Sequence, residues 1–399
     1  MTRRGAAGKQ AGRRRTRASR GRHLGAPGSW PLPAGLVAGA VLDVLAGDPR
    51  RAHPVAAFGR AAAMLESRLY ADGRLRGAAY ACACVAAATL PAAAVSRLTR
   101  RHPLARGAAA AITAWVVTGA RSLRGTAERV AILLEAGDIE AARDALPALC
   151  GRDPDGLGAK ELARAVTESV AENTSDAAVA PLLWGAAAGL PGLAAYRAVN
   201  TLDAMVGYRS PRYARFGWAS ARFDDAANWV PARLTALLTA ACAPAAGGSP
   251  AGALRAAYRY GARHPSPNAG YPEAAFAGAL GLRLGGSSSY GGVAEHRPEL
   301  GEGRPPGPAD IRRAIRLSRA VTAAATVLAA FVAVLVRAGV PGSVRASPAS
   351  RGSRSGLMTR WAGPGYVSES FTWSPAAART LSGRPGPVAS AESCAREVR

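Results

Sequence analysis

The 399-residue sequence contains very few lysines and few aromatic residues. Only Lys9 and Lys160 are lysines, so arginine carries nearly all of the formal net charge of +25, and Phe, Trp and Tyr together make up 6%. Zinc-finger spacing, RNP-type aromatic motifs and basic helices with base-reading residues are also missing. These absences exclude the usual nucleic-acid-binding classes, which leaves an anionic ligand or a membrane surface to account for the positive charge.

The cysteines indicate no special chemistry, and the sequence contains few signals for β-strands. The cysteines form neither a disulfide framework nor paired metal spacing: Cys82, Cys84, Cys150, Cys242 and Cys394. We interpret them as small buried hydrophobes in a reducing compartment. Alternating β-branched runs are scarce and there is no Asn-Gly hairpin, whereas apolar residues three and four apart are common. The sequence therefore predicts an all-α fold.

Composition divides the chain into three parts. Residues 1–30 are basic and glycine-rich and lack the apolar core of a signal peptide, so we expect a disordered basic tail. Residues 341–399 are rich in Ser, Pro, Gly and Arg without apolar periodicity, which predicts a second disordered tail. Residues 31–340 are expected to form one helical, membrane-embedded domain.

Several alanine-rich apolar stretches predict a multi-pass helical membrane protein with polar helical loops. They cover Ala34–Ala46, Gly77–Val95, Gly107–Ala120, Ala177–Ala195, Leu234–Gly247 and Ala320–Val336. The last has no charge over sixteen residues and lies between Arg319 and Arg337, so it is a good candidate for a membrane span. Buried helices of a soluble bundle are the alternative. The basic N-terminal tail is expected on the cytoplasmic side.

An acidic segment, ESVAENTSDAAVAPLLW, precedes one of these apolar stretches. In a helix, Glu168, Glu172 and Asp176 would lie four residues apart on one stripe, about 5–6 Å from one another. Like charges at this spacing repel, and no Lys or Arg separates them. A divalent cation, most plausibly Mg²⁺, explains the stripe, while a solvated cap before a buried helix is the alternative.

Two further segments repeat this pattern of oxygen ligands. YRAVNTLDAMVGY carries Asn200 and Asp203 three apart, and FDDAANWVPARL carries Asp224, Asp225 and Asn228. Three such groups within about sixty residues predict a magnesium and polyphosphate site between helices. Candidate phosphate or carboxylate clamps are nearby arginines, namely Arg197, Arg209, Arg222 and Arg233.

Two turn-rich segments supply the histidine candidates. GDPRRAHPVAAFGR contains His53, and its alternative is an ordinary loop after the first helix. RHPSPNAGYPE contains His264, Ser266 and Asn268, and is followed by a Gly-Gly-Ser-Ser-Ser run. Amide groups in such a run can cradle an anion, but the spacing alone favours a flexible linker.

Taken together, these motifs closely resemble those of the CobD/CbiB family of cobalamin biosynthesis. The resemblance covers about residues 35–336 and includes the following segments in family order: GDPRRAHPVAAFGR, ESVAENTSDAAVAPLLW, YRAVNTLDAMVGY, ARFDDAANWVPARL and HPSPNAGYPEAAFAGALGLRLGG. The resemblance implies a multi-pass protein of the inner membrane. It also implies an adenosylcobinamide-phosphate synthase, which joins adenosylcobyric acid to aminopropanol or aminopropanol phosphate using ATP, near other late enzymes of the pathway.

Such a ligase needs Mg²⁺, cationic side chains and a base that deprotonates the amine. As a hypothesis, the carboxylates Glu168, Glu172, Asp176, Asp203, Asp224 and Asp225 bind metal. Arg197, Arg233, His264 and His53 are the catalytic candidates, with either histidine as the general base. The substrate-binding candidates are Asn173, Asn200, Asn228, Ser266 and Asn268.

Two other functions compete with this one. Intramembrane prenyl or phospho-alcohol transferases also place Asn and Asp pairs around Mg²⁺ and a diphosphate, but usually with longer and more hydrophobic spans. A non-enzymatic, membrane-anchored partner that only holds a corrinoid intermediate is the third possibility.

Overall fold

The computed structural model describes residues 30–49, 53–208, 210–290 and 293–339. Over these residues the chain is helical apart from connecting loops and one antiparallel hairpin, so the predicted helical fold is confirmed. The two tails predicted as disordered lie, except for residue 30, outside the described residues.

The helices and strands follow one another in this order: α1 (Pro31–Ala46), α2 (Pro54–Leu69), α3 (Arg74–Leu98), η1 (Thr99–Arg101), α4 (Pro103–Val117), α5 (Ala120–Glu135), α6 (Ile139–Ala145), η2 (Leu146–Ala148), α7 (Ala159–Thr174), η3 (Ser175–Val179), α8 (Ala180–Val206), α9 (Tyr213–Phe216), α10 (Trp218–Cys242), η4 (Ala243–Ala246), α11 (Pro250–Tyr260), η5 (Gly261–Arg263), α12 (Gly270–Leu280), β1 (Leu284–Tyr290), β2 (Val293–Leu300) and α13 (Pro308–Gly339). The segment after α4 forms α5 and α6, and α5 places its apolar residues, three and four apart, in the core.

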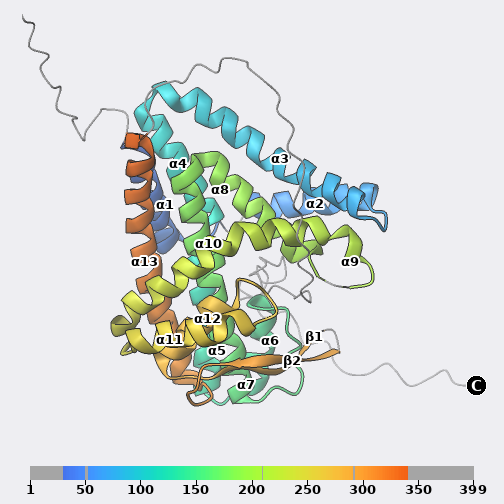
Figure 1. Ribbon diagram of the computed structural model, residues 1–399, viewed down its shortest axis with the longest axis vertical. Coiled ribbons are helices and arrows are strands. Elements are labelled where there is room, and N and C mark those ends of the chain that lie inside the picture. The colour runs from blue at the N-terminus through green and yellow to red at the C-terminus, as the bar shows by residue number, and fades with distance from the viewer. Residues whose placement is uncertain (1–29, 50–52, 209, 291–292, 340–399) are drawn as a thin grey trace, which may run out of the picture.

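The helices form two stacked parts (Figure 1). The upper part is a bundle of α1, α4, α8 and the C-terminal half of α13, and the lower part contains α5, α6, α7, α11, α12 and the β1–β2 hairpin. Helix α10 crosses the molecule between the two parts, while α2, α3 and α9 extend to one side. The largest hydrophobic core continues through both parts, from Leu32 in α1 to Ile315 in α13.

Small residues allow α1 and α4 to pack side by side at unusually short distance. A Cβ atom added at Gly35 would lie 2.5 Å from the Ala110 Cβ, and one added at Gly39 would lie 2.5 Å from the Ala114 Cβ. Glycine four residues apart on one helix against alanine four apart on the other is the small-xxx-small pattern of membrane helix pairs. The alanine-rich composition thus serves close helix packing.

Helix α8 folds back on itself at Gly189. This residue has a φ of 69° and a ψ of −146°, a conformation that favours glycine, and Pro191 follows it. A Cβ added at Gly192 would lie 2.3 Å from the carbonyl oxygen of Trp184, which is possible only when the two arms of α8 run antiparallel. The stretch Ala177–Ala195, predicted as one apolar run, is therefore a helical hairpin.

Three helical stretches are long and apolar enough to cross a membrane. They are Arg74–Arg101, Ala159–Val206 and Pro308–Ala338, and α1 is a shorter apolar helix. The stretch predicted from Ala320 to Val336 lies within the third of these. The second contains the turn at Gly189, so its length does not correspond to one straight span. Membrane insertion, and the number of spans, stay predictions.

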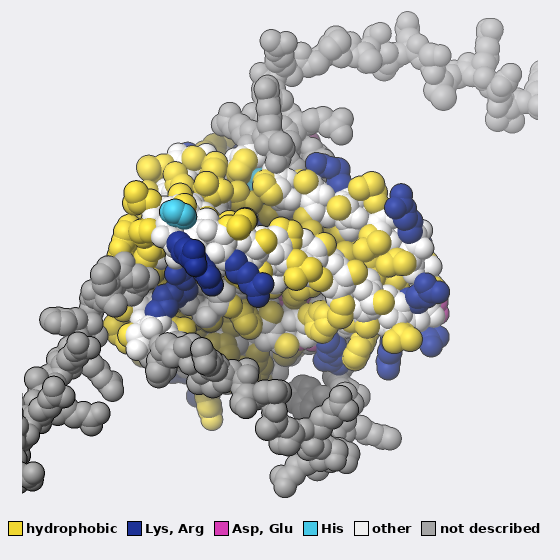
Figure 2. Space-filling view, turned by 90° about the horizontal axis from the view of Figure 1, so that it is seen from above, with side chains coloured by type: hydrophobic (Ala, Val, Ile, Leu, Met, Phe, Trp, Pro, Cys, Tyr) yellow, Lys and Arg dark blue, Asp and Glu magenta, His cyan; other side chains and the backbone are white. Residues whose placement is uncertain are grey.

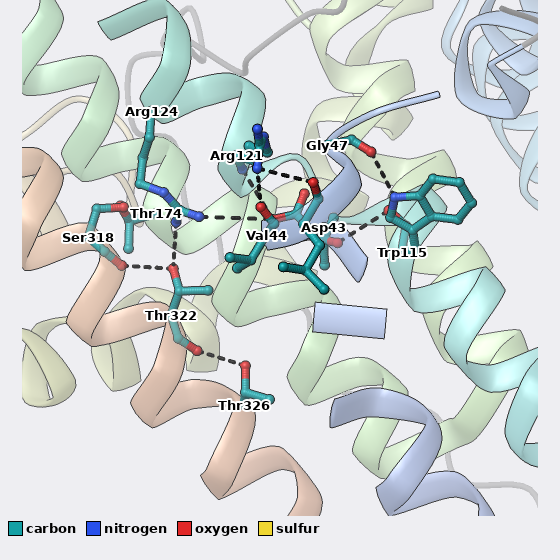
Figure 3. A network of polar contacts seen from close by, with 12 residues as sticks. Asp43, Val44, Gly47, Trp115, Arg121, Arg124, Thr174, Ser318, Thr322 and Thr326 are labelled. Atoms are coloured by element: carbon teal, nitrogen blue, oxygen red, sulfur yellow. Dashed lines mark hydrogen bonds and ion pairs between the residues drawn. The ribbon is translucent and has the colours of Figure 1, made fainter. Parts of the chain in front are cut away.

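A buried polar network fixes the lower end of the bundle (Figure 3). Asp43 at the end of α1 accepts a hydrogen bond from the Arg121 backbone amide at 3.1 Å, and its carboxylate lies 4.0 Å from the Arg124 guanidinium. Arg124 also donates to the Thr322 hydroxyl on α13 at 3.3 Å. The network ties α1, α5 and α13 together directly beside α7, whose Thr174 donates to Ser318 at 2.7 Å.

The Gly-Gly-Ser-Ser-Ser run, predicted as a flexible linker, is part of β1 and pairs with β2 in an antiparallel hairpin. A register shift between Leu284 and Gly286 marks an irregularity that glycine permits, because Gly285 and Gly286 have φ values of 84° and 91°. Arg164 on α7 donates to the carbonyl oxygens of Gly285 and Ser287 and so attaches the hairpin to the helices. The linker prediction was wrong because these contacts come from elements distant in sequence.

Replacing Gly39 with valine is expected to destabilise the fold by about 1–3 kcal/mol, because the new side chain would separate α1 from α4. Thermal unfolding of the full chain in detergent would measure the effect. The matched control is Gly125→Val on α5, where an added Cβ would meet no atom within 4 Å. Equal unfolding temperatures for both variants would contradict the close packing of α1 and α4.

Candidate functional site

A cavity of about 1430 Å³ lies between η3, the descending arm of α8, α9, α10 and the loop that precedes α12. Eleven of the residues predicted for the site line it: Glu172, Asp176, Asp203, Arg222, Asp224, Asp225, Asn228, Arg233, His264, Ser266 and Asn268. The predicted clamp Arg209 lies outside the described residues. Segments separated by as many as a hundred residues along the chain thus meet at one cavity, as the recurring polar pairs predicted.

The acidic segment reaches this cavity through a turn of π-helix. Residues Ser175–Val179 form η3 between α7 and α8, and π-turns within helices are frequent at functional sites. The Tyr196 hydroxyl lies 3.1 Å from the Asp176 carbonyl oxygen and 2.9 Å from the Asn228 Oδ1. Glu168 and Glu172 both lie in α7, four residues apart as the predicted stripe requires, whereas Asp176 lies in the wider turn and departs from that stripe.

Asp224 on α10 is buried and held by two amide side chains. Asn228 donates to its Oδ2 at 2.9 Å, and Asn200 on α8 donates to its Oδ1 at 3.5 Å. Burial raises the pKa of Asp224 to about 6, with the neighbouring Asp225 carboxylate adding to the rise and the two amides opposing it. Burial also raises the pKa of Asp225, and Arg222 at 3.4 Å counteracts it.

The donor set fits a hard divalent cation that keeps phosphate or water among its ligands. Asp176 and Asp224 are both buried and close enough for their charges to interact. The Ser175 hydroxyl beside them is buried without a hydrogen-bond partner among the described residues. Within those residues no group of three His, Cys, Asp or Glu side chains is arranged so that it could hold a metal ion by itself. Mg²⁺ rarely needs one, since it usually takes one or two carboxylates and completes its shell with phosphate oxygens and water.

Arg197, Asn200 and His53 form a layer behind the cavity wall. Arg197 is buried on α8 and donates to Asn200 Oδ1 at 3.5 Å. Asp48, in the loop after α1, is close enough to interact electrostatically with both Arg197 and His53. Burial lowers the pKa of His53, and its Nδ1 accepts the Val55 amide at the start of α2. These side chains support the wall and do not line the cavity.

Glu168 and Asn173 also point away from the cavity. Both Glu168 oxygens are engaged, with Oε2 2.6 Å from the Arg152 guanidinium and Oε1 accepting the Gly285 amide at 2.6 Å. The ion pair is buried on both sides. Asn173 donates to the Ser169 carbonyl oxygen at 3.0 Å. The structure thus gives Glu168 a structural partner instead of a place in the cavity.

The loop before α12 is ordered by the predicted histidine and serine. The His264 Nδ1 accepts the Ser266 amide at 3.1 Å, and its Nε2 lies 3.7 Å from the buried carboxylate of Glu273. The Ser266 hydroxyl accepts the amides of Asn268 and Ala269, both at 3.2 Å. Both ring nitrogens of His264 therefore face protein groups, which makes this side chain a positioning residue for the loop.

Arg233 lies between two aromatic rings of the cavity wall. Its guanidinium carbon is 4.2 Å from the ring centroids of both Trp229 and Tyr271, and Nη1 donates to the Trp229 carbonyl at 2.8 Å. Asn268 donates to the Asp225 carbonyl at 2.8 Å and so joins this stack to the acidic side. The cavity thus has an acidic wall and an aromatic, arginine-containing wall.

The cavity includes residues that the sequence did not single out. Arg74 at the start of α3 stacks 5.6 Å over the Trp218 ring, and both line the cavity together with Tyr213 and Arg263. Arg74 and Trp218 are more than a hundred residues apart and belong to no common motif. Tyr271, by contrast, lies in the segment HPSPNAGYPE close to His264, so the sequence could have predicted its place in the site.

Comparison with known proteins gives consistent matches to one family. The family model described as CobD/Cbib protein matches residues 36–318. The chain is 56% identical over 306 residues to the cobalamin biosynthesis protein CobD of Mycobacterium tuberculosis (strain ATCC 25618 / H37Rv), covering 76% of this chain and 97% of that protein. Proteins of the same name from Geobacter metallireducens and Rhodobacter capsulatus are 47% and 44% identical, covering 66% and 72% of this chain and 84% and 91% of theirs. No solved structure matches the chain.

Replacing Glu168 with glutamine is expected to destabilise the fold by about 3–5 kcal/mol, because the Arg152 charge would lose its buried partner. Chemical or thermal unfolding in detergent would measure this. The exposed Glu161→Gln on the same helix is the matched control, and its stability should stay within about 0.5 kcal/mol of the parent chain. A Glu168→Gln protein that is equally stable, but has lost metal binding, would reverse the structural assignment.

Proposed function

The chain belongs to the CobD/CbiB family and has a role in cobalamin biosynthesis, and we propose that it is an ATP-dependent acid–amine ligase. Its reaction joins aminopropanol or aminopropanol phosphate to a carboxylate of adenosylcobyric acid and gives adenosylcobinamide or its phosphate. We infer a corrinoid substrate from the role in cobalamin biosynthesis, and we infer ligase chemistry from the residues that line the cavity.

The observation that carries this proposal is the division of one large cavity into two chemically different walls. Glu172, Asp176 and Asp203 line the acidic wall, and Arg233 with Trp229 lies in the aromatic wall. A volume of about 1430 Å³ exceeds that of most small-ligand sites. It suits a reaction whose participants include both a charged nucleotide and part of a large, flat macrocycle.

The acidic wall fits Mg²⁺ bound to a nucleotide. Glu172, Asp176 and Asp203 would supply carboxylate oxygens one or two at a time, and Ser175 a hydroxyl. Bound Mg²⁺ would neutralise phosphate charge, and ATP would supply the activation that a carboxylate needs before an amine can displace one of its oxygens. Asp224, fixed by two amides, lines the same cavity and adds a further carboxylate to this wall.

The protein's own side chains then bind and orient the two partners. Arg222 and Arg263 line the cavity and can pair with carboxylate or phosphate oxygens. The amine arrives protonated and must lose a proton before it attacks. Asp225 lines the cavity, and its raised pKa makes it a better proton acceptor than an ordinary aspartate. His264 keeps the loop beside it in place.

The three candidate spans support a location in the cell membrane. The cavity lies below the apolar bundle of α1, α4, α8 and α13, so a bilayer around that bundle would place the site at the membrane boundary. Substrates could then arrive from water while the helices remain in lipid. Other late enzymes of the pathway are the partners expected on this side.

An assay with the purified full chain tests the reaction class. With adenosylcobyric acid, aminopropanol phosphate, ATP and Mg²⁺, we expect amide product, nucleotide hydrolysis coupled to it, and loss of both on chelation by EDTA. Product formation without ATP would instead indicate a transferase. If neither amide product nor nucleotide hydrolysis is detected, while another family member assayed in parallel as a control is active, the ligase proposal is contradicted.

Substitution within the acidic wall tests the site. Asp176→Asn and Glu172→Gln should each lower kcat by about 100-fold or more, because they remove carboxylate ligands of the metal. The control Asp144→Asn, on an exposed position of α6, should leave kcat unchanged. Unfolding temperatures close to the parent value would show that the loss is catalytic. Full activity of both variants would show that this wall does not bind a metal ion that the reaction needs.

A further inference from the structure

The end of the bundle that lies farthest from the cavity carries a cluster of arginines from four elements. It consists of Arg97 in α3, Arg100 and Arg101 in η1, Arg106 in α4 and Arg337 in α13. We call these five residues the arginine cap. We propose that the arginine cap binds the headgroups of anionic phospholipids.

The arginines at this end of the bundle have no acidic side chains near them in sequence that would balance their positive charge. The sequence has no Asp or Glu between Asp72 and Glu128, and none between Asp310 and the end of α13. Among the described residues, no ion pair reaches any of the five arginines. Seen from this end, dark-blue Lys and Arg side chains stand among yellow hydrophobic ones, and acidic side chains are scarce (Figure 2).

Two of the arginines lie near each other, and none of the ion pairs among the described residues involves either of them. The charges of Arg106 and Arg337 are close enough to repel each other, and both side chains are half-buried. The Arg337 guanidinium also lies beside the turn of α8, 3.8 Å from where a Cβ of Gly189 would stand. Its Nη1 donates to the Ala333 carbonyl of its own helix. An anion at this place would relieve the repulsion.

The surroundings specify a lipid headgroup instead of a small soluble anion. Leu98 and Leu104, on either side of Arg100 and Arg101, are 78% and 76% exposed. Exposed leucines that alternate with arginines are typical of a surface at the level of lipid headgroups, where side chains of both kinds are satisfied. Two candidate spans, Arg74–Arg101 and Pro308–Ala338, end at this level.

The test titrates the full chain, purified in a neutral detergent, with dioctanoyl phosphatidylglycerol, dioctanoyl phosphatidylcholine and glycerol 3-phosphate, and measures binding by calorimetry. We expect phosphatidylglycerol to bind at least tenfold more tightly than phosphatidylcholine, and binding to weaken in 500 mM salt. Glycerol 3-phosphate should bind much more weakly, since it has no acyl chains for the leucines. Equal affinities for the two lipids, or tight binding of glycerol 3-phosphate, would overturn the proposal.

Variants locate the site, which matters because the sequence is also basic in residues 1–29 and 340–399. Arg101→Gln with Arg106→Gln should weaken phosphatidylglycerol binding about 25-fold, since each arginine near an anionic surface contributes about fivefold. Lys160→Gln with Arg255→Gln removes the same charge from exposed positions of α7 and α11 in the lower part, and should change binding less than twofold. An equal loss in both double variants would show nonspecific charge attraction and contradict the arginine cap. Ligase activity is measured separately, so failure here leaves the proposed function untouched.

Discussion

One phenolic hydroxyl joins the three helical segments that carry the acidic side chains. Tyr196 on the descending arm of α8 contacts both the Asp176 carbonyl in η3 and the Asn228 amide on α10. Asn228 in turn holds Asp224. A buried polar group is costly unless its partners are fixed, so this chain of contacts determines how η3, α8 and α10 approach one another. The acidic wall depends on that approach.

The molecule separates charge along its length. Among the described residues, most acidic side chains lie in the lower part or line the cavity, and Glu66 and Asp72 lie to the side near α2 and α3. The end of the bundle that carries the arginine cap has no acidic residue in α4 or in the C-terminal half of α13. Close helix packing through Gly35 and Gly39 needs no polar contacts and suits an apolar environment. The polar network around Asp43 and Arg124 marks the transition between the two parts.

The sequence predicted the helices and the convergence of acidic segments because both follow from local periodicity and repeated residue types. It did not predict which carboxylates reach the cavity. Glu168 and Glu172 look equivalent in sequence. In the structure, however, Glu168 forms a buried ion pair with Arg152, which lies sixteen residues earlier in the chain. The turn at Gly189 and the pairing of β1 with β2 were also missed, since each depends on contacts that no short window contains.

The π-turn at Ser175–Val179 makes the length of the acidic segment as important as its composition. A helix with one residue fewer at this place would turn every later side chain of the ascending arm by about 100° relative to α7. Asp176 would then leave both Tyr196 and the cavity, although every acidic residue was still present. We therefore expect homologous proteins to tolerate substitutions in this segment more readily than single-residue insertions or deletions.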